Sequence, residues 1–390
     1  MRIRARLGMA VLVAMGGTAT SCPPTNGDLE SDQQLTELVD ALDAKIPAIM
    51  QDANTPGLAI VLIREREIAW QKTYGVRVAD TAERVGERTI FEAGSMSKPL
   101  FAFAALRLVD AGKLDLDRPL DSYLAAPYLP DQPAAAQITA RMVLVHTSGL
   151  PDTRPRGGAG PLRLQFAPGS GFLYSGEGFR LLQSVVERIV GEDLAAYADR
   201  EIMRPLGMSR SGYRWRDEFA DELAAGHNAS GEPRTDRSLY HRPNAANSLY
   251  TTAADYARFL VEMLGPPTPV APLSDELREA MTTVQWRGHR DKSIRSLGWR
   301  IDPTSGYVHH SGASHGGFRS FSRFHPELGS GLVIMTNSAD GQKVREPILR
   351  VIATSAGDAY DNGAITFAQR IIERLRKLYF RLSQPEPVPL

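Results

Sequence analysis

Two residues of complementary chemistry stand three positions apart in the segment Gly94-Ser95-Met96-Ser97-Lys98. On a helix this spacing places the Ser95 hydroxyl and the Lys98 amine on one face, about 5–6 Å apart at Cβ. A serine becomes an effective nucleophile only when a neighbouring base takes its proton. The pair therefore predicts nucleophilic catalysis by Ser95, provided that groups from elsewhere in the chain complete the site.

The next candidate group is Tyr174, which lies in the segment 166–176, rich in glycine and other helix breakers. A helix is expected directly after it, with apolar residues on one face up to Val190. A tyrosine held in such a loop could reach over a cleft, and a nearby Lys98 charge would favour its phenolate form. Tyr174 could then act as the base for Ser95. The alternative is a packed surface tyrosine.

A third candidate segment is Tyr307-Val308-His309-His310-Ser311-Gly312-Ala313, which has the character of a strand. Alternate residues of a strand face opposite sides, so only one of the two histidines can face a cleft. The small Gly312 would let a substrate approach the strand edge closely. The N–H groups of Ser95 and Ala313 are candidate oxyanion donors. No acidic residue or third histidine stands at useful spacing for a metal, so we expect neither a metal nor another cofactor.

The elements that must position these groups follow from hydrophobic periodicity and from breakers. Pro99 is tolerated only in the first turn of a helix, so that helix must begin near Ser95, and it ends at Gly112. Residues 58–63 and 68–76 predict an antiparallel hairpin. Further strands are expected at 296–301, 307–311, 318–324 and 331–337, with a helix over 347–355.

This order of elements predicts an α+β fold, in which an antiparallel sheet flanked by helices is interrupted by an inserted, mostly helical lobe. The α/β lobe would comprise residues 33–105 plus 290–360, and the helical lobe with its loops residues 106–289. The catalytic cleft is expected between the two lobes.

Taken together, these segments resemble the serine beta-lactamase-like family, which includes class C beta-lactamases, D-alanyl-D-alanine peptidases and their esterase relatives. Ser95-Met96-Ser97-Lys98 matches its Ser-x-x-Lys, Tyr174-Ser175-Gly176 lies at its Tyr-x-Asn, and His310-Ser311-Gly312 lies at its Lys-Thr-Gly or His-x-Gly. Supporting matches are Leu144 to Leu150, Pro205 to Met208 and Leu249 to Asp255. The resemblance covers roughly residues 33 to 357 and implies a beta-lactamase/transpeptidase-like fold.

The resemblance also implies roles for individual residues. Ser95 would be the acylated nucleophile, and Lys98 would shuttle a proton. Tyr174 would be general base and then acid to the leaving group. His310 would lie beside the bound acyl group. The substrate would be a small or peptide-like ester or amide.

Two positions depart from the family pattern. Gly176 replaces the asparagine that usually contacts the lysine and the substrate amide. His310 replaces the lysine that attracts the carboxylate of penicillins and peptides, and a histidine is mostly neutral at neutral pH. Both replacements favour ester hydrolysis, or cleavage of a less anionic amide, over efficient beta-lactam cleavage. The alternative function is a peptidoglycan- or penicillin-binding sensor, or a penicillin-binding protein that turns over slowly.

A different hydrolase motif, Gly-x-Ser-x-Gly, is also present around Ser314. In an α/β-hydrolase this motif precedes a helix, and an acid and then a histidine follow. Here a strand-like segment follows, and no Asp or Glu lies between Ser314 and the last histidine, His325. The α/β-hydrolase interpretation therefore fails.

Composition restricts the class of protein further. The chain has 390 residues, is 43% hydrophobic and carries a formal net charge of +0. Without a basic excess to neutralise phosphates, nucleic-acid binding is not expected as its main task. No apolar run reaches the ~18 residues that span a bilayer.

Both termini carry sequence signals of their own. Residues 1–22 combine arginines, a short apolar core and small residues before Cys22, the single cysteine, and so predict an export signal. The segment resembles a bacterial lipoprotein signal, which implies lipidation of Cys22 and attachment in the cell envelope or periplasm; the alternative is an ordinary signal peptide. Residues 23–32 would be a tether.

The extension 361–390 predicts a basic amphipathic helix that packs on the protein, mediates self-association or lies on a membrane. The oligomeric state stays open.

Overall fold

The structure is a computed structural model that describes residues 26–155, 160–236, 239–266, 269, 271–288 and 293–355. Residues 1–25, with the expected export signal and Cys22, and the expected extension 361–390 lie outside the described residues. Within the described ranges, no helix combines the length and the apolar character needed to cross a membrane.

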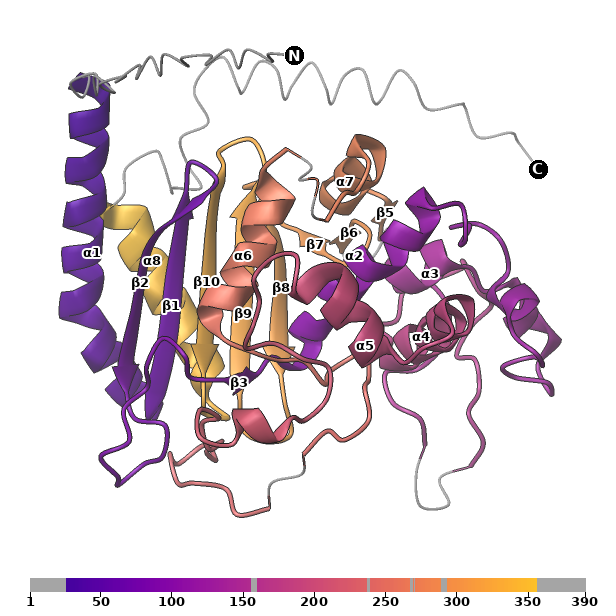
Figure 1. The fold of residues 1–390 in the computed structure, drawn as a ribbon, viewed down its shortest axis with the longest axis horizontal. Helices are drawn as coiled ribbons and strands as arrows, with labels where there is room; N and C mark the ends of the chain where they lie inside the picture. The colour runs from indigo at the N-terminus through magenta and orange to yellow at the C-terminus, as the bar shows by residue number, and fades with distance from the viewer. Residues whose placement is uncertain are drawn as a thin grey trace, which may run out of the picture.

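The helices and strands follow the expected alternation of sheet and helical segments (Figure 1). The helices are α1 (Asn26–Asp52), α2 (Ser97–Asp110), α3 (Ala140–Leu144), α4 (Gly176–Val190), α5 (Leu194–Ala198), α6 (Ala253–Leu264), α7 (Asp275–Thr282) and α8 (Arg345–Ser355). The strands are β1 (Gly57–Arg64), β2 (Glu67–Gly75), β3 (Phe91–Glu92), β4 (Tyr250–Thr251), β5 (Trp286–Arg287), β6 (Ile294–Arg295), β7 (Arg300–Ile301), β8 (Val308–Ala313), β9 (Arg319–His325) and β10 (Ser330–Thr336).

Eight of the described strands form one antiparallel sheet in the order β2-β1-β10-β9-β8-β7-β6-β5. The expected hairpin is present, with Ala59 opposite Thr73 in β1 and β2. The second neighbour of β1 is β10, where Leu58 lies opposite Thr336. The strands β1 and β2 therefore complete a sheet whose other members lie between residues 286 and 336.

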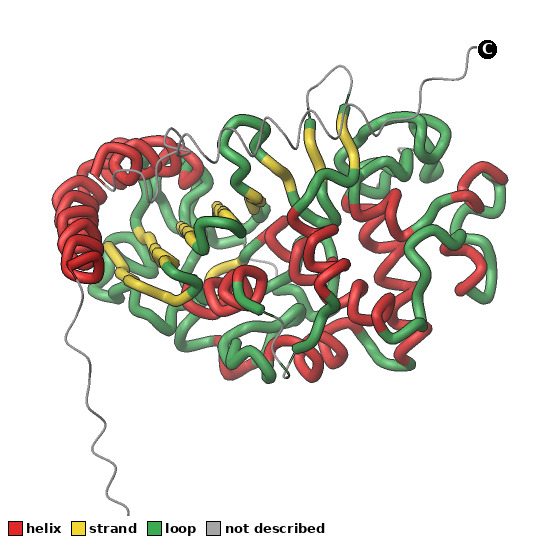
Figure 2. The backbone as a smooth tube through the Cα atoms, turned by 90° about the horizontal axis from the view of Figure 1, so that it is seen from above, coloured by secondary structure: helices red, strands yellow, loops and turns green. Residues whose placement is uncertain are grey.

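The apolar run of β1 is explained by helices on both faces of the sheet. Leu58, Ile60 and Leu62 pack in one cluster with α1 and α8, on the left of Figure 1. Ala59, Val61 and Ile63 face the opposite side and join the large core that contains α2 and α6. Figure 2 shows helices on both sides of the strands. Burying each large aliphatic side chain contributes about 1.5–3 kcal/mol, so both faces hold the sheet in place.

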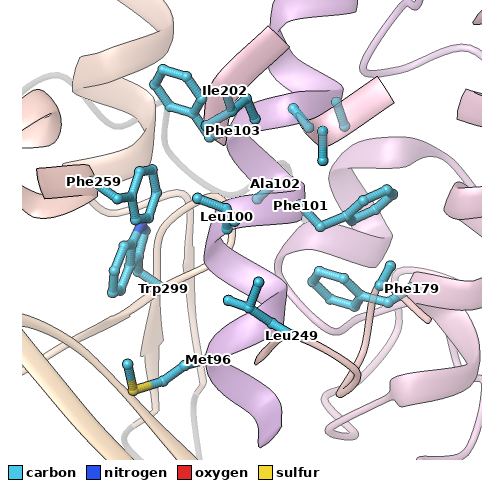
Figure 3. Packing of buried hydrophobic residues seen from close by; sticks show 14 of the residues in the cluster. Met96, Leu100, Phe101, Ala102, Phe103, Phe179, Ile202, Leu249, Phe259 and Trp299 are labelled. Atoms are coloured by element: carbon cyan, nitrogen blue, oxygen red, sulfur yellow. The ribbon is translucent and has the colours of Figure 1, made fainter. Parts of the chain in front are cut away.

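Helix α2 runs through the interior, and Figure 3 shows it between Phe259 and Trp299 on one side and Phe179 on the other. Its side chains from Pro99 to Leu106 are apolar and buried on every face, which is typical of a helix segment without a solvent face. The Phe101 ring lies 6.0 Å from that of Phe179 in α4, and the Phe103 ring lies 5.7 Å from that of Phe259 in α6. Packing on all sides fixes the helix that carries Lys98.

Three elements bear on the expected division of the chain into a tether and two lobes. Helix α1 begins at Asn26, within the segment 23–32 that was expected to be a tether. Helix α6, assigned by sequence to the helical lobe 106–289, packs against β1 and β10, because its apolar stripe is buried on the sheet. Strand β5 also lies within 106–289 but pairs with β6 and extends the sheet.

Candidate active site

Ser95 lies in a single 3₁₀ turn, Gly94–Met96, that leads directly into α2. The Lys98 ammonium donates a hydrogen bond to Ser95 Oγ at 3.1 Å. The expected one-face arrangement of the two groups is therefore present. It brings a nucleophile and an amine within proton-transfer distance, which is the geometric requirement for activating a serine.

Two glycines allow the Ser95 turn to pack closely against the end of β8. Gly94 has φ +53°, and a Cβ there would lie 2.8 Å from Ala313 N and 2.6 Å from Ala313 O. At Gly312 a Cβ would lie 1.9 Å from Ala93 O. A side chain at Gly312 would therefore collide with the backbone of the chain itself. The same close packing brings the backbone of Ala313, the expected second oxyanion donor, beside the Ser95 turn.

Lys98 is 1% exposed, and its other hydrogen bond goes to Ala246 O at 2.8 Å. In the family pattern an asparagine contacts this lysine, and here Gly176 has no side chain to do so. A backbone carbonyl from the segment before β4 takes that place. Sequence motifs cannot show such a partner, because a backbone carbonyl is present at every position.

Tyr174 presents its ring to Lys98, with the ammonium 4.7 Å from the ring centroid. A second ring, that of Phe179, lies 5.7 Å from the same ammonium. Aromatic faces attract a cation, so the two rings and the Ala246 carbonyl hold Lys98 Nζ beside Ser95. The structure thus brings the three sequence-predicted catalytic residues together, and the hydrogen bond to Ser95 comes from Lys98.

His146 holds Tyr174 in position. Its ring lies 4.4 Å from the Tyr174 ring, and its Nδ1 accepts a hydrogen bond from Ser175 N at 3.1 Å. His146 has φ +64°, a left-handed conformation that costs energy for a residue with a side chain. Burial, together with the charges of Arg295 and Lys98, lowers its pKa well below the usual value, so the ring is neutral. Sequence analysis included His146 only as part of a supporting match.

The two histidines of β8 face opposite sides of the sheet. His310 lines the cavity beside Ser95, its ring 6.4 Å from that of Tyr174. Burial, and then the Lys98 charge, holds the pKa of His310 well below its usual range. Burial, and then Arg300, lowers the pKa of His309 on the other face to about 4. His310 is therefore neutral and cannot attract a carboxylate by charge.

A cavity of about 560 Å³ opens at Ser95. Its lining includes the expected Ser95, Tyr174, His310, Ser311, Gly312 and Ala313, whereas Lys98 is buried beneath it. It also includes charged residues that sequence reasoning missed, namely Asp152, Arg300, Arg319 and Arg345, which we call the charged lining. They come from separate segments, so no spacing in the sequence groups them.

One edge of β8 is open at the cavity. Strand β7 pairs with β8 only through Arg300 with His309 and Ile301 with Val308. Residues 310–313 therefore have no strand neighbour on that side among the described residues. An unpaired strand edge can pair with the backbone of an extended ligand.

The Gly-x-Ser-x-Gly motif does not form a second site. Ser314 is 8% exposed and follows the end of β8, and the next element is strand β9 rather than a helix. In the described part of the chain no three His, Cys, Asp or Glu side chains cluster as a metal site would require.

Comparison with known proteins identifies the family. The beta-lactamase family model matches residues 42–356. Esterase EstB of Burkholderia gladioli is 27% identical over 386 residues, a match that takes in 83% of this chain and 95% of the esterase. Protein flp of Staphylococcus aureus is 22% identical over 318 residues, and the match takes in 76% of this chain and 62% of that protein.

Solved structures agree on the fold. A class C beta-lactamase superposes with a TM-score of 0.68 at 21% identity, covering 80% of this chain and 96% of that one. The D-alanine carboxypeptidase AmpC from Burkholderia cenocepacia gives a TM-score of 0.67 at 24% identity, covering 81% and 99%. The expected beta-lactamase/transpeptidase-like fold is confirmed.

Proposed function

The chain belongs to the beta-lactamase family and is a serine hydrolase of that family, and we propose that it cleaves an ester or amide through an acyl-enzyme on Ser95. The observation that carries this proposal is the 3.1 Å hydrogen bond between Lys98 Nζ and Ser95 Oγ, in a turn packed against Ala313. A nucleophile, a proton-transfer group and a backbone amide then meet at one cavity.

The reaction has two halves. Ser95 Oγ attacks the substrate carbonyl carbon, and its proton passes to Tyr174, which acts as the general base beside the Lys98 ammonium. The N–H groups of Ser95 and Ala313 bind the negative oxygen of the tetrahedral intermediate. Tyr174 then gives a proton to the leaving oxygen or nitrogen as its bond to the carbonyl breaks. Water, deprotonated by the Lys98–Tyr174 pair, attacks the acyl-enzyme and releases the acid and free Ser95.

The substrate class that fits best is a small or peptide-like ester. A neutral His310 offers no charge for a penicillin carboxylate, and Gly176 offers no amide for its side chain. The name of the relative EstB supports the ester branch over the beta-lactam branch. The open edge of β8 suits an extended acyl chain.

The test is a panel of short-chain p-nitrophenyl esters, a chromogenic cephalosporin and D-alanyl peptides, combined with intact mass and peptide mapping. Steady ester turnover with the acyl group on Ser95 is the expected result. A stoichiometric burst without turnover would instead support the penicillin-binding alternative. Turnover without any Ser95 adduct under acid quench would contradict the acyl-enzyme.

We also propose that residues 1–22 direct export and that Cys22 receives a lipid in the cell envelope. The support is sequence alone: arginines, an apolar core and small residues before a lone cysteine. Membrane fractionation of the full chain and of Cys22→Ala tests it. Loss of the membrane-bound fraction in the variant is expected, and an unchanged distribution would contradict lipidation.

A further inference from the structure

The space beside Gly176, where the family pattern has an asparagine side chain, is occupied by Asp152. An ideal Cβ at Gly176 would lie 2.5 Å from Asp152 O and 3.0 Å from Asp152 Oδ1. Asp152 is 24 residues earlier in the chain and lines the same cavity as Ser95 and Tyr174. A carboxylate therefore stands where the family pattern has a neutral amide that contacts the substrate.

The Asp152 carboxylate is held in place by the start of α4. Its Oδ1 accepts a hydrogen bond from Gly176 N at 3.0 Å. On either side of it, Ser175 Oγ donates to Pro151 O at 3.0 Å, and Arg154 Nε donates to the fully buried Glu177 at 2.9 Å. These contacts fix the loop against the helix, so the carboxylate is positioned before any substrate arrives.

The Asp152 carboxylate has no cationic partner among the described residues. The guanidinium of Arg154, two residues later in the chain, forms its ion pair with Glu177 and not with Asp152. No Lys or Arg of the described ranges forms an ion pair with Asp152, and it is the single acidic residue among the described residues that line the cavity. The arginines of the charged lining come from β7, β9 and α8, whereas Asp152 lies in the loop that contacts the start of α4.

We propose that Asp152 makes this cavity select substrates whose acyl group carries a protonated amine. An ionised carboxylate only accepts hydrogen bonds, so it pairs with an ammonium and repels the carbonyl oxygen that an asparagine amide would bind. The amine belongs in the acyl part because Asp152 takes the place of the side chain that contacts the substrate amide. The proposal rests on the proposed function, since it names the substrate class of the Ser95 site.

The experiment compares two p-nitrophenyl esters that differ in one group. The β-alanyl ester ends in an ammonium where the butyryl ester ends in a methyl, and both release the same leaving group. The readout is the ratio of kcat/KM for the β-alanyl ester to kcat/KM for the butyryl ester. Using one ratio for every variant removes the different intrinsic reactivity of the two esters.

The decisive variant is Asp152→Asn, which keeps an oxygen to accept from Gly176 N and removes only the charge. The ratio is expected to fall about tenfold, chiefly through KM of the β-alanyl ester, since an ion-assisted hydrogen bond is replaced by a neutral one. The matched control is Asp52→Asn, which removes an exposed carboxylate at the end of α1, outside the cavity lining, and should leave the ratio unchanged. Raising the ionic strength should lower the wild-type ratio.

The outcomes separate this proposal from the one on which it rests. An equal ratio in wild type and Asp152→Asn would overturn the selection by Asp152 while leaving ester hydrolysis intact. Equal falls in Asp152→Asn and Asp52→Asn would also overturn it, because net charge alone would then explain the effect. Hydrolysis of neither ester, with no adduct on Ser95, would instead overturn the proposed function.

Discussion

The cavity joins two sets of residues in contrasting surroundings. The first, which we call the reacting group, comprises Ser95, Lys98, Tyr174 and His310, of which Lys98 is 1% and His310 3% exposed. The second is the charged lining, in which Asp152 and Arg300 are exposed and Arg345 is half-buried. Lys98 and His310 are thus shielded from water and Ser95 and Tyr174 are half-buried, whereas the charged lining is more open to solvent.

The difference separates chemistry from recognition. Charges act strongly in a buried, low-dielectric environment and weakly where water screens them. The reacting group should therefore control kcat by orders of magnitude. The charged lining should change the preference among substrates by about tenfold. Substitutions in the two sets test whether this division holds.

The largest effect is expected from Ser95→Ala. Without the nucleophile no acyl-enzyme can form, and ester turnover should fall by at least about 10⁴-fold while thermal unfolding is unchanged. The matched control is Ser314→Ala, which removes the serine of the Gly-x-Ser-x-Gly motif and should retain activity. Activity lost in Ser314→Ala and kept in Ser95→Ala would reassign the nucleophile.

Tyr174→Phe should reduce kcat by about 10²–10⁴-fold, the usual contribution of general acid–base catalysis. The ring that faces Lys98 remains, so only the hydroxyl is lost and the lysine stays in place. Steady-state and single-turnover measurements with one ester give the result. Full activity of Tyr174→Phe would show that the Tyr174 hydroxyl is not needed for proton transfer and would leave Lys98 as the remaining candidate.

A smaller effect is expected from His146→Asn, because His146 acts through Tyr174. Asparagine tolerates the left-handed backbone at this position but removes the ring that packs on Tyr174. We expect kcat to fall about tenfold, as for a modest misplacement of a catalytic group. In a double-mutant cycle the effect should disappear when Tyr174 is already Phe. If His146→Asn still lowered kcat about tenfold in the Tyr174→Phe variant, His146 would not act through the Tyr174 hydroxyl.

The smallest effect concerns the stability of the protein in acid and lies outside both sets of residues. The pKa of His309 is about 4 in the folded protein and about 6.5 in the unfolded chain. Between these two pH values the unfolded chain binds a proton at His309 and the folded protein does not. The free energy of unfolding should therefore fall as pH drops from 7 to 5.5, by about 1 kcal/mol from this residue alone.

Urea unfolding at pH 7 and 5.5 measures this prediction, with His309→Gln as the comparison. The variant should lose about 1 kcal/mol less than wild type on acidification. Equal losses would mean that His309 is protonated in the folded protein.

The sequence predicted the fold and the reacting group because both depend on local patterns. The Ser95–Lys98 spacing, the breaker-rich loop at Tyr174 and the strand containing His310 each lie within one segment. The hairpin of β1 and β2 follows likewise from two apolar runs and a short polar turn.

What the sequence could not predict depends on contacts between distant segments. Asp152 reaches Gly176, and Ala246 O reaches Lys98, through loops without a recognisable motif. Gly312 was expected as a point of close approach for a substrate, and the sequence gives no sign that Ala93 O also approaches it. Helix α6 has the periodicity of any amphipathic helix, and periodicity does not say which neighbour covers it.

The pairing of β1 with β10 has a consequence for folding kinetics. The second strand partner of β1 is near the end of the fold, so during synthesis this strongly apolar strand must wait for almost the whole chain. Such long-range pairing folds slowly and exposes aggregation-prone surface in the meantime. Ala313 is synthesised long after the Ser95 turn on which it packs. A nascent chain that ends before β8 therefore contains the nucleophile but lacks the strand that completes the site.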